Sequence, residues 1–319
     1  MKINIDMTIV SYVNNLIYGK DIYLCFSQNT CYSIIDKGLY QVYIMIGEST
    51  ISEDCMYKIE CTNQIEYTLD TRDTKAKLDL KYPIVNNEHF LKIADFNISN
   101  KDISNLYTIS KDEKYIFLDM NKEYVNIVHL NSTGGIIIKV DSRQVVNERK
   151  YLLETRIIND CFKIARQSKV RLLESNGNLI FGVGTNVIIK VKQFNKDEKV
   201  YNAYGHYKIY LDRNNYLKET RCNYMLIEDK FSVINDGIKS LINDGRDLMY
   251  KGVKVKRDFS DINYYDNNQE EEDLLYFSVS KIEKYMKLEM APRTYCSVGK
   301  NHVKIFDTNT TIILPTLKI

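Results

Sequence analysis

The sequence predicts an α+β protein of three tandem domains, each with helices on one side of antiparallel sheets. Three observations predict this fold. A Thr-Asn pair occurs at residues 62–63, 185–186 and 308–309, at an equal interval of 123 residues. Each pair lies between runs in which apolar and polar residues alternate, the period of a β-strand. Stretches with helical spacing of apolar residues precede the second and third pairs. Together these observations indicate a threefold internal repeat.

The three Thr-Asn segments are each expected to form a β-hairpin. They cover Met56–Asp70, Leu179–Gln193 and His302–Thr316. Asn tolerates the positive φ of a tight turn, and the flanking runs are rich in Ile, Val, Tyr and Phe. Further turns are expected at Ser175–Asn178 and Val298–Asn301, each following one more strand. The second and third domains are therefore expected to end in similar sets of strands.

The second domain is expected to contain a helix over residues 150–168. Its apolar residues recur at helical spacing; they are Leu153, Ile157, Cys161, Ile164 and Ala165. The opposite side carries polar and basic residues; they are Arg156, Asn159, Lys163 and Arg166. This pattern is typical of a helix with one face on a sheet and a basic face in solvent.

Other helices are expected from weaker patterns. They cover residues 7–18, 100–109, 231–243 and 278–288. The last has Lys281, Lys284 and Lys287 opposite an apolar side. The run at residues 34–46 fits a helix or, because it is rich in β-branched residues, a strand.

The second domain also contains an earlier set of strands. Strands are expected at Tyr115–Met120 and Tyr124–Leu130, and a turn at Gly134-Gly135 leads into a further strand at Ile136–Val140. The first domain is short, because a full period of 123 residues would begin it before Met1. We therefore expect it to have lost part of its first half.

The expected domains are residues 1–86, 87–200 and 201–319. Each would bury a core of its own.

Composition excludes several classes of protein. The chain has 319 residues, 44% of them hydrophobic and 27% charged, which is typical of a folded protein rather than a disordered one. No apolar stretch is long enough for a membrane helix, and no signal peptide is recognised. Seven cysteines, an odd number in a long chain, favour a reducing compartment, so we expect a cytoplasmic protein. The abundance of Ile, Lys, Asn and Tyr is typical of a virus or a low-GC bacterium; for a virus the compartment would be the host cytoplasm.

The near-zero net charge of the chain does not exclude a nucleic-acid partner. Lys and Arg number 44 against 42 Asp and Glu, for a net charge of +2. Any basic surface must therefore be local and balanced by acidic surface elsewhere.

Catalytic signatures are absent from the sequence. It contains no phosphate-binding G-x-x-x-x-G-K-[ST], no H-E-x-x-H, no G-x-S-x-G and no C-x-x-C. Four scattered histidines offer little material for a catalytic or metal site, and the acidic run at Glu270–Asp273 is typical of a solvated loop. We expect a non-catalytic protein without a metal or cofactor, although a hydrolase using an Asp/Glu pair stays open.

Several stretches resemble the DNA sliding clamp, the bacterial-type DNA polymerase III β subunit. ISNLYTISKDEKYIFLDMNKEYVNIVHLNSTGG, from Ile103, resembles the start of that family's middle domain, and KYLLETRIINDCFKIARQSKVRLLESNGNLIFGVGTNVIIKV, from Lys150, resembles its second half. KYPIV at 81–85 lies where the family has a boundary between domains, and TIILPTLKI resembles its C-terminal end. The resemblance is poor over residues 1–50 and 210–275. It implies a non-catalytic processivity factor.

Basic helix faces suit such a protein, because contacts to phosphates position a protein on DNA without reading its sequence. The two faces described above, together with the resemblance, predict a surface for double-stranded DNA; its residues are Lys150, Arg156, Lys163, Arg166, Lys169, Lys239, Lys281, Lys284 and Lys287.

The resemblance also implies a groove that binds an apolar peptide of a DNA polymerase; its residues are Gly135, Ile136, Ile137, Ile312, Leu314, Pro315 and Leu317. If they converge, they should form an exposed apolar patch. The family implies a homodimeric ring and a clamp loader, although the short first domain puts ring closure in question. Two alternatives remain: a clamp-like transcription or replication accessory protein that does not close a ring, and a β-rich viral structural protein.

Overall fold

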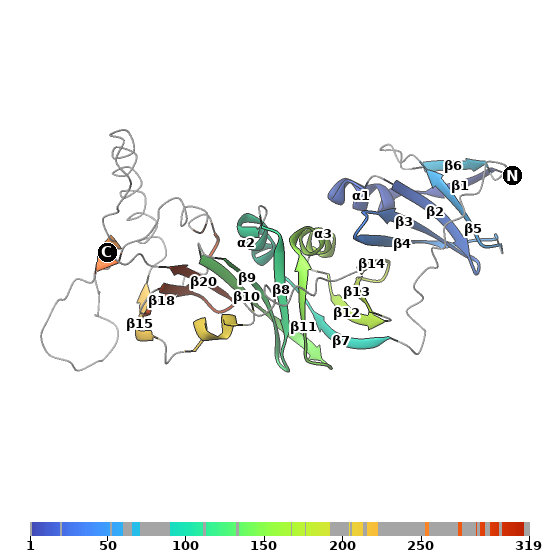
Figure 1. The fold of residues 1–319 in the computed structure, drawn as a ribbon. Coiled ribbons are helices and arrows are strands. Elements are labelled where there is room, and N and C mark those ends of the chain that lie inside the picture. The colour runs from blue at the N-terminus through green and yellow to red at the C-terminus, as the bar shows by residue number, and fades with distance from the viewer. Residues whose placement is uncertain are drawn as a thin grey trace, which may run out of the picture. The chain divides into compact units, whose positions relative to one another are not determined.

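The structure is a computed structural model, drawn in Figure 1. It describes residues 2–19, 21–51, 53–59, 66–70, 90–110, 113–131, 134–166, 168–175, 177–191, 204, 206–212, 216–222, 253–254, 274–275, 285, 288–290, 294–299 and 302–315. Every structural statement below refers to these residues.

The first repeat runs from β1 to β6. Its elements are β1 (Lys2–Asp6), α1 (Thr8–Ile17), β2 (Asp21–Ser27), β3 (Thr30–Asp36), β4 (Tyr40–Glu48), β5 (Cys55–Ile59) and β6 (Glu66–Asp70). The expected helix at 7–18 is confirmed. The ambiguous run at 34–46 is not a helix but covers the end of β3 and most of β4. The side chains of β2 and β3 are buried on both faces, which explains their nearly continuous apolar sequence.

The second repeat runs from β7 to β14. Its elements are β7 (Leu91–Phe96), α2 (Asn100–Ser110), β8 (Tyr115–Met120), β9 (Tyr124–Asn131), β10 (Gly134–Val145), β11 (Arg149–Glu154), α3 (Thr155–Ala165), β12 (Val170–Ser175), β13 (Asn178–Val183) and β14 (Val187–Val191). The order of helix, strands, helix, strands agrees with the sequence. The expected helix at 150–168 begins later, because residues 149–154 form β11.

The third repeat is described in part. Its elements are η1 (His206–Tyr210), β15 (Tyr216–Cys222), β16 (Val253–Lys254), β17 (Leu274–Leu275), β18 (Thr294–Gly299), β19 (His302–Phe306) and β20 (Thr310–Pro315). The expected helix at 231–243 and the acidic run at 270–273 lie outside the described residues, as does most of the expected helix at 278–288.

The chain forms two compact units. The first comprises residues 1–103, 114–125 and 140–196, and the second comprises residues 104–113, 126–139 and 197–319. Within the first unit the strand order is β7-β12-β13-β14-β4-β3-β2-β5, with β1 and β6 paired separately. Within the second unit it is β15-β18-β19-β20-β10. The three expected domain ranges stay a prediction.

The pairing of strands shows how the first repeat relates to the second. In the second repeat β11 pairs with β8 and β12 pairs with β7. In the first repeat β5 pairs with β2 and β6 pairs with β1. Hence β5 and β6 correspond to β11 and β12, while β1, α1, β2, β3 and β4 form a complete first half. The expectation that part of the first half is lost is wrong; the shortening falls in the second half. Only six residues separate β5 from β6, fewer than the 11 residues of α3.

One type of junction occurs twice. β14 pairs with β4, the fourth strand of the preceding repeat, and β20 pairs with β10 in the same way. The Asn of the second and of the third Thr-Asn pair accepts a further backbone hydrogen bond: Met45 N–H donates to the Asn186 carbonyl over 2.8 Å, and Lys139 N–H donates to the Asn309 carbonyl over 2.7 Å. The 123-residue interval between these two pairs therefore reflects a real structural repeat.

The Thr-Asn pair at 62–63 does not belong to this repeat. The pair lies outside the described residues, but the strands on either side of it are β5 and β6, which pair with different strands and in different sheets. The expected hairpin at Met56–Asp70 is therefore wrong. The hairpins at 185–186 and 308–309 are confirmed, since β13 pairs with β14 and β19 pairs with β20.

Helix α3 packs on the sheet through aromatic and aliphatic side chains. Phe162 meets Phe96 of β7 edge-on, with ring centroids 6.4 Å apart. Ile157, Ile158 and Cys161 are buried as well. Asn159, expected on the polar side, is also buried, so the apolar contact surface of α3 is broader than the sequence pattern indicates.

Candidate nucleic-acid interface

Three basic residues of the expected DNA surface lie together on α3 or at its end. Arg156 and Arg166 are exposed, and Lys163 is half-buried. Arg166 ends the helix in the left-handed conformation, at φ 34°, with its N–H donating to the Phe162 carbonyl over 3.1 Å. The apolar side of α3 faces the sheet, so these cations occupy its outer side. We call Arg156, Lys163 and Arg166 the α3 basic face.

Each cation of the α3 basic face has a neighbour within the chain. Arg156 Nε lies 3.1 Å from Glu154 Oε2, and Lys163 Nζ lies 3.9 Å from Asp160 Oδ1. The Arg156–Glu154 pair is exposed enough to be weak, so a phosphate can replace it. In the second pair Lys163 is half-exposed, whereas Asp160 is mostly buried.

Asp160 is held at the junction between the first and second repeats. The Tyr40 hydroxyl of β4 donates a hydrogen bond to its carboxylate. Burial raises the pKa of Asp160 above its ordinary value, although Tyr40, Lys37, Lys163 and Arg156 act in the opposite direction. The buried carboxylate thus links α3 to β4 and offsets part of the positive charge nearby.

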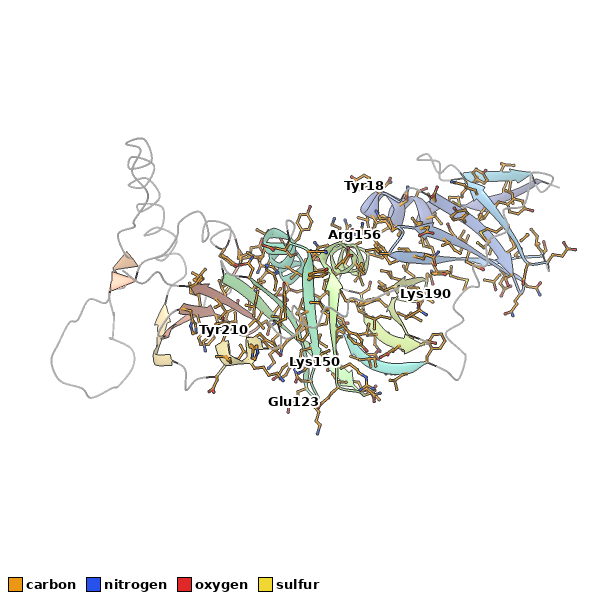
Figure 2. The ribbon with its side chains drawn as sticks, in the orientation of Figure 1. Tyr18, Glu123, Lys150, Arg156, Lys190 and Tyr210 are labelled. Carbon is orange, nitrogen blue, oxygen red and sulfur yellow. The ribbon has the colours of Figure 1, made fainter. Side chains whose placement is uncertain are left out.

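Lys150 and Lys169 do not share the α3 basic face. Lys150 is exposed on β11, opposite Asp119, and Figure 2 shows it far from Arg156 in that view. The Lys169 ammonium lies 2.7 Å from Asp95 Oδ2. Asp95 adjoins Phe96 on β7, and successive residues of a strand point to opposite faces. Because Phe96 packs on α3, Asp95 and its partners lie on the other face of the sheet.

Asp95 gathers three cations on that face. Besides Lys169, Lys92 Nζ lies 3.0 Å from its carboxylate and Arg171 Nε lies 3.3 Å away. Burial acts to raise the pKa of Asp95, but the hydrogen bonds and charges of Lys169 and Lys92 outweigh it, so the pKa lies below its ordinary value. This carboxylate was not singled out in the sequence, since its partners are up to 76 residues away.

An Asp95→Asn variant is expected to be about 1–2 kcal/mol less stable at pH 7, because the half-exposed cations lose a charged partner. A carboxyl group with a lowered pKa contributes stability above its unfolded pKa and loses that contribution as pH falls through its folded pKa. The difference between variant and wild type should therefore shrink as pH is lowered below about 4. Urea unfolding at several pH values measures it, and a difference that stays constant with pH would contradict the ion-pair explanation.

The remaining expected DNA-binding residues, Lys239, Lys281, Lys284 and Lys287, lie outside the described residues.

The two segments of the expected groove converge. β10 and β20 pair so that Ile136 lies opposite Ile312 and Ile137 lies opposite Thr311. Leu314 and Pro315 extend β20, where they pair with Val303 and His302 of β19. Leu317 lies outside the described residues.

The expected exposure of these residues is wrong. Ile136, Ile137, Ile312 and Leu314 are all at most 2% exposed, and Pro315 is half-buried. Their apolar character is explained by packing between strands, on both faces of β10 and β20.

The glycine pair also has a structural role. Gly134 and Gly135, which were expected to form a turn, are the first two residues of strand β10. A Cβ atom on Gly134, at φ +134°, would lie 2.6 Å from the Ile313 carbonyl oxygen, and one on Gly135 would lie 2.6 Å from the His129 carbonyl oxygen. Both positions need glycine so that neighbouring backbones can approach closely.

Tyr12 of α1, which sequence reasoning did not single out, lies beside the α3 basic face. Tyr12 is 46% exposed, and the Arg166 guanidinium lies 5.5 Å from its ring centroid. The available signal was the composition of α1, which has no charged residue although one side of it faces solvent.

No group of three or more His, Cys, Asp or Glu residues in the described part of the chain is placed to hold a metal ion. Among the helices of this part, none combines the length and apolarity needed to cross a membrane.

Solved structures of bacterial sliding clamps match this fold over nearly the whole chain. The DNA polymerase III β subunit of Thermotoga maritima is 9% identical, covering 100% of this chain and 99% of its own, with a TM-score of 0.66. The DNA polymerase sliding clamp of Bacillus subtilis is 12% identical, covering 100% and 99%, with a TM-score of 0.63. The Helicobacter pylori β clamp bound to a DNA ligase peptide is 7% identical, covering 100% of both chains, with a TM-score of 0.63.

Comparison of the sequence with protein-family models and with curated proteins gives no match. The chain has the sliding-clamp fold, and the resemblance noted in its sequence is confirmed at the level of fold.

Proposed function

We propose that this protein is a sliding-clamp processivity factor, which encircles duplex DNA without reading its sequence and tethers a DNA polymerase. It works as a homodimer in the cytoplasm, without a cofactor or a reaction of its own, and a clamp loader places it on DNA. The observation that carries the proposal is the clamp fold over the full chain, at a TM-score of 0.66. Support also comes from the α3 basic face, which offers cations to phosphates and no specific contact to bases.

We propose that an apolar peptide of the polymerase docks at the junction of β10 and β20. The convergence of two distant segments there supports this choice. Gly135, Ile136, Ile137, Ile312 and Leu314 would form the floor, while Pro315 would form the end nearest the C-terminus. Leu317, outside the described residues, is included on the sequence resemblance alone. The buried floor residues would have to shift for a peptide to enter.

Retention on DNA tests encirclement. Once a clamp loader has placed the wild-type protein on a nicked circular plasmid, it is expected to stay there during gel filtration and to leave when the plasmid is cut, because a ring can slide off a DNA end. Replacing Arg156, Lys163 and Arg166 with Glu should lower retention on the circle at least about tenfold, since three favourable phosphate contacts become repulsive.

A matched control uses the same change of charge elsewhere in the first unit: Lys58, Lys122 and Lys190 replaced with Glu. This control should keep most of the retention. Equal losses in both triple variants would show that only net charge matters, and would remove α3 as the DNA surface.

The second candidate is a clamp-like accessory protein that binds a polymerase without closing a ring. It is favoured by the short second half of the first repeat, where only six residues separate β5 from β6, fewer than the 11 residues of α3. The mass in solution and the retention on DNA distinguish the two candidates. A dimer that is retained on circular DNA supports the clamp, and a monomer that is retained equally on circular and linear DNA supports the accessory protein.

A further inference from the structure

The outer side of α1 is unusual for a helix that faces solvent. The helix, TIVSYVNNLI, contains no charged residue. Its exposed residues Thr8, Ile9 and Asn15 each lie three or four residues from the exposed Tyr12, so they share one side with it. A helix side of this kind offers an aromatic ring, an aliphatic group and an amide where Lys or Glu is usual.

Helix α1 lies beside α3 within the first unit. Arg166, at the end of α3, lies over the Tyr12 ring at 5.5 Å from its centroid. Both side chains are exposed. The ring of Tyr12 is thus combined with a guanidinium, and Arg156 and Lys163 continue the positive charge along the neighbouring helix.

The ends of α1 are fixed, which keeps this surface in place. At the start, the Asp6 carboxylate accepts a hydrogen bond from Thr8 N–H over 2.8 Å. At the end, the Lys37 ammonium donates hydrogen bonds to the Ile17 and Tyr18 carbonyls. On the inner side of α1, its residues Val10, Val13 and Ile17 are buried.

We propose that the outer side of α1, with Tyr12 and Arg166 at its centre, binds single-stranded nucleic acid by stacking a base on Tyr12 while the α3 basic face holds phosphates. In a duplex the faces of the bases are covered by their neighbours, so a protein on its outside meets mainly phosphate and sugar. A single strand exposes base faces, which stack on aromatic side chains, and arginine adds a cation–π contribution. Tyr12 therefore favours a single strand over a duplex, whereas the cations serve both.

This inference rests on the proposed function for the use of the α3 basic face. It adds a second kind of DNA to the same side of the molecule: the protein would hold duplex by its cations and a neighbouring unpaired strand by Tyr12.

The test is fluorescence anisotropy with labelled dT20, rU20 and a 20-base-pair duplex, using the full chain. Tyr12→Ala should weaken binding of dT20 about five- to hundredfold and leave duplex binding within about twofold. Tyr12→Phe, which keeps the ring, should bind dT20 like wild type. The dT20 and rU20 arms distinguish DNA from RNA as the occupant.

Tyr107→Ala is the matched control, because Tyr107 on α2 is 44% exposed, close to the value for Tyr12. It should change dT20 binding less than Tyr12→Ala does. Thermal unfolding of each variant checks that the fold is kept.

The proposal is overturned if the wild-type protein binds neither dT20 nor rU20. It is also overturned if Tyr12→Ala weakens the binding of single strand and of duplex equally. Failure of the clamp function has a different signature: the α3 triple variant would keep its retention on circular duplex, whatever the result with dT20.

Discussion

A Leu314→Asp variant is expected to lose most of its folded population. Leu314 is only 1% exposed in β20, where it lies opposite Val303 of β19. Removing a buried leucine side chain costs about 2–5 kcal/mol, and an unpaired buried carboxylate adds several more. Since a folded protein is stable by only about 5–15 kcal/mol, the sum is comparable to the whole. Circular dichroism during thermal unfolding measures the loss.

Thr308→Asp provides the control for this prediction, because Thr308 is exposed in the turn just before the same strand. It should unfold close to the wild-type temperature. An unchanged midpoint for Leu314→Asp would mean that Leu314 is accessible in solution, as the sequence alone indicates.

The burial of Leu314 also determines how peptide docking has to be tested. Loss of polymerase binding in Leu314→Asp would follow from unfolding alone. Leu314→Met, which nearly conserves volume, should cost less than about 1.5 kcal/mol and keep the fold. A change in polymerase stimulation with that variant would bear on the groove itself.

A Phe162→Ala variant is expected to be about 3–5 kcal/mol less stable than wild type. Phe162 and Phe96 are both fully buried and meet edge-on, so the truncation removes an aromatic pair and leaves a cavity between α3 and the sheet. Urea unfolding followed by circular dichroism gives the free energy of unfolding.

Arg156→Ala, on the outer side of the same helix, should stay within about 0.5 kcal/mol of wild type. A loss below about 1 kcal/mol for Phe162→Ala would contradict the packing of α3 on β7, and with it the assignment of the basic face to the outer side.

Local patterns predicted much of the fold. The strands expected at residues 115–120 and 124–130 and the helix expected at residues 100–109 agree with β8, β9 and α2 to within a residue. In α2 burial on one side produces a helical period, whereas β8 and β9 are buried on both faces and were recognisable from their aromatic and β-branched residues. The helix expected from residue 150 begins instead at Thr155, because Tyr151, Leu152 and Leu153 are consecutive buried residues of a strand. A short continuous apolar run does not distinguish a strand from the start of a helix.

Properties that depend on distant parts of the chain were not predictable. Lys169 directly follows the helix expected at residues 150–168. Its partner Asp95 comes from β7, however, and holds it on the face of the sheet opposite α3. Ile136 and Leu314 lie in short apolar runs, and their burial depends on the pairing of β10 with β20, which are far apart in the sequence. The Thr-Asn pair at 62–63 matched the interval of the other two by coincidence, because spacing carries no information about which strands pair.

The junctions of β14 with β4 and of β20 with β10 have a consequence for how such a chain can diverge. They are made by main-chain groups, which every residue except proline provides. Side chains can therefore be exchanged almost freely, as the 9% identity to a chain of the same fold illustrates. The number of residues is not free in the same way, since one inserted residue in β14 would turn each following side chain to the opposite face. In this architecture, mutations that change length should be far rarer within the junction strands than mutations that change residue type.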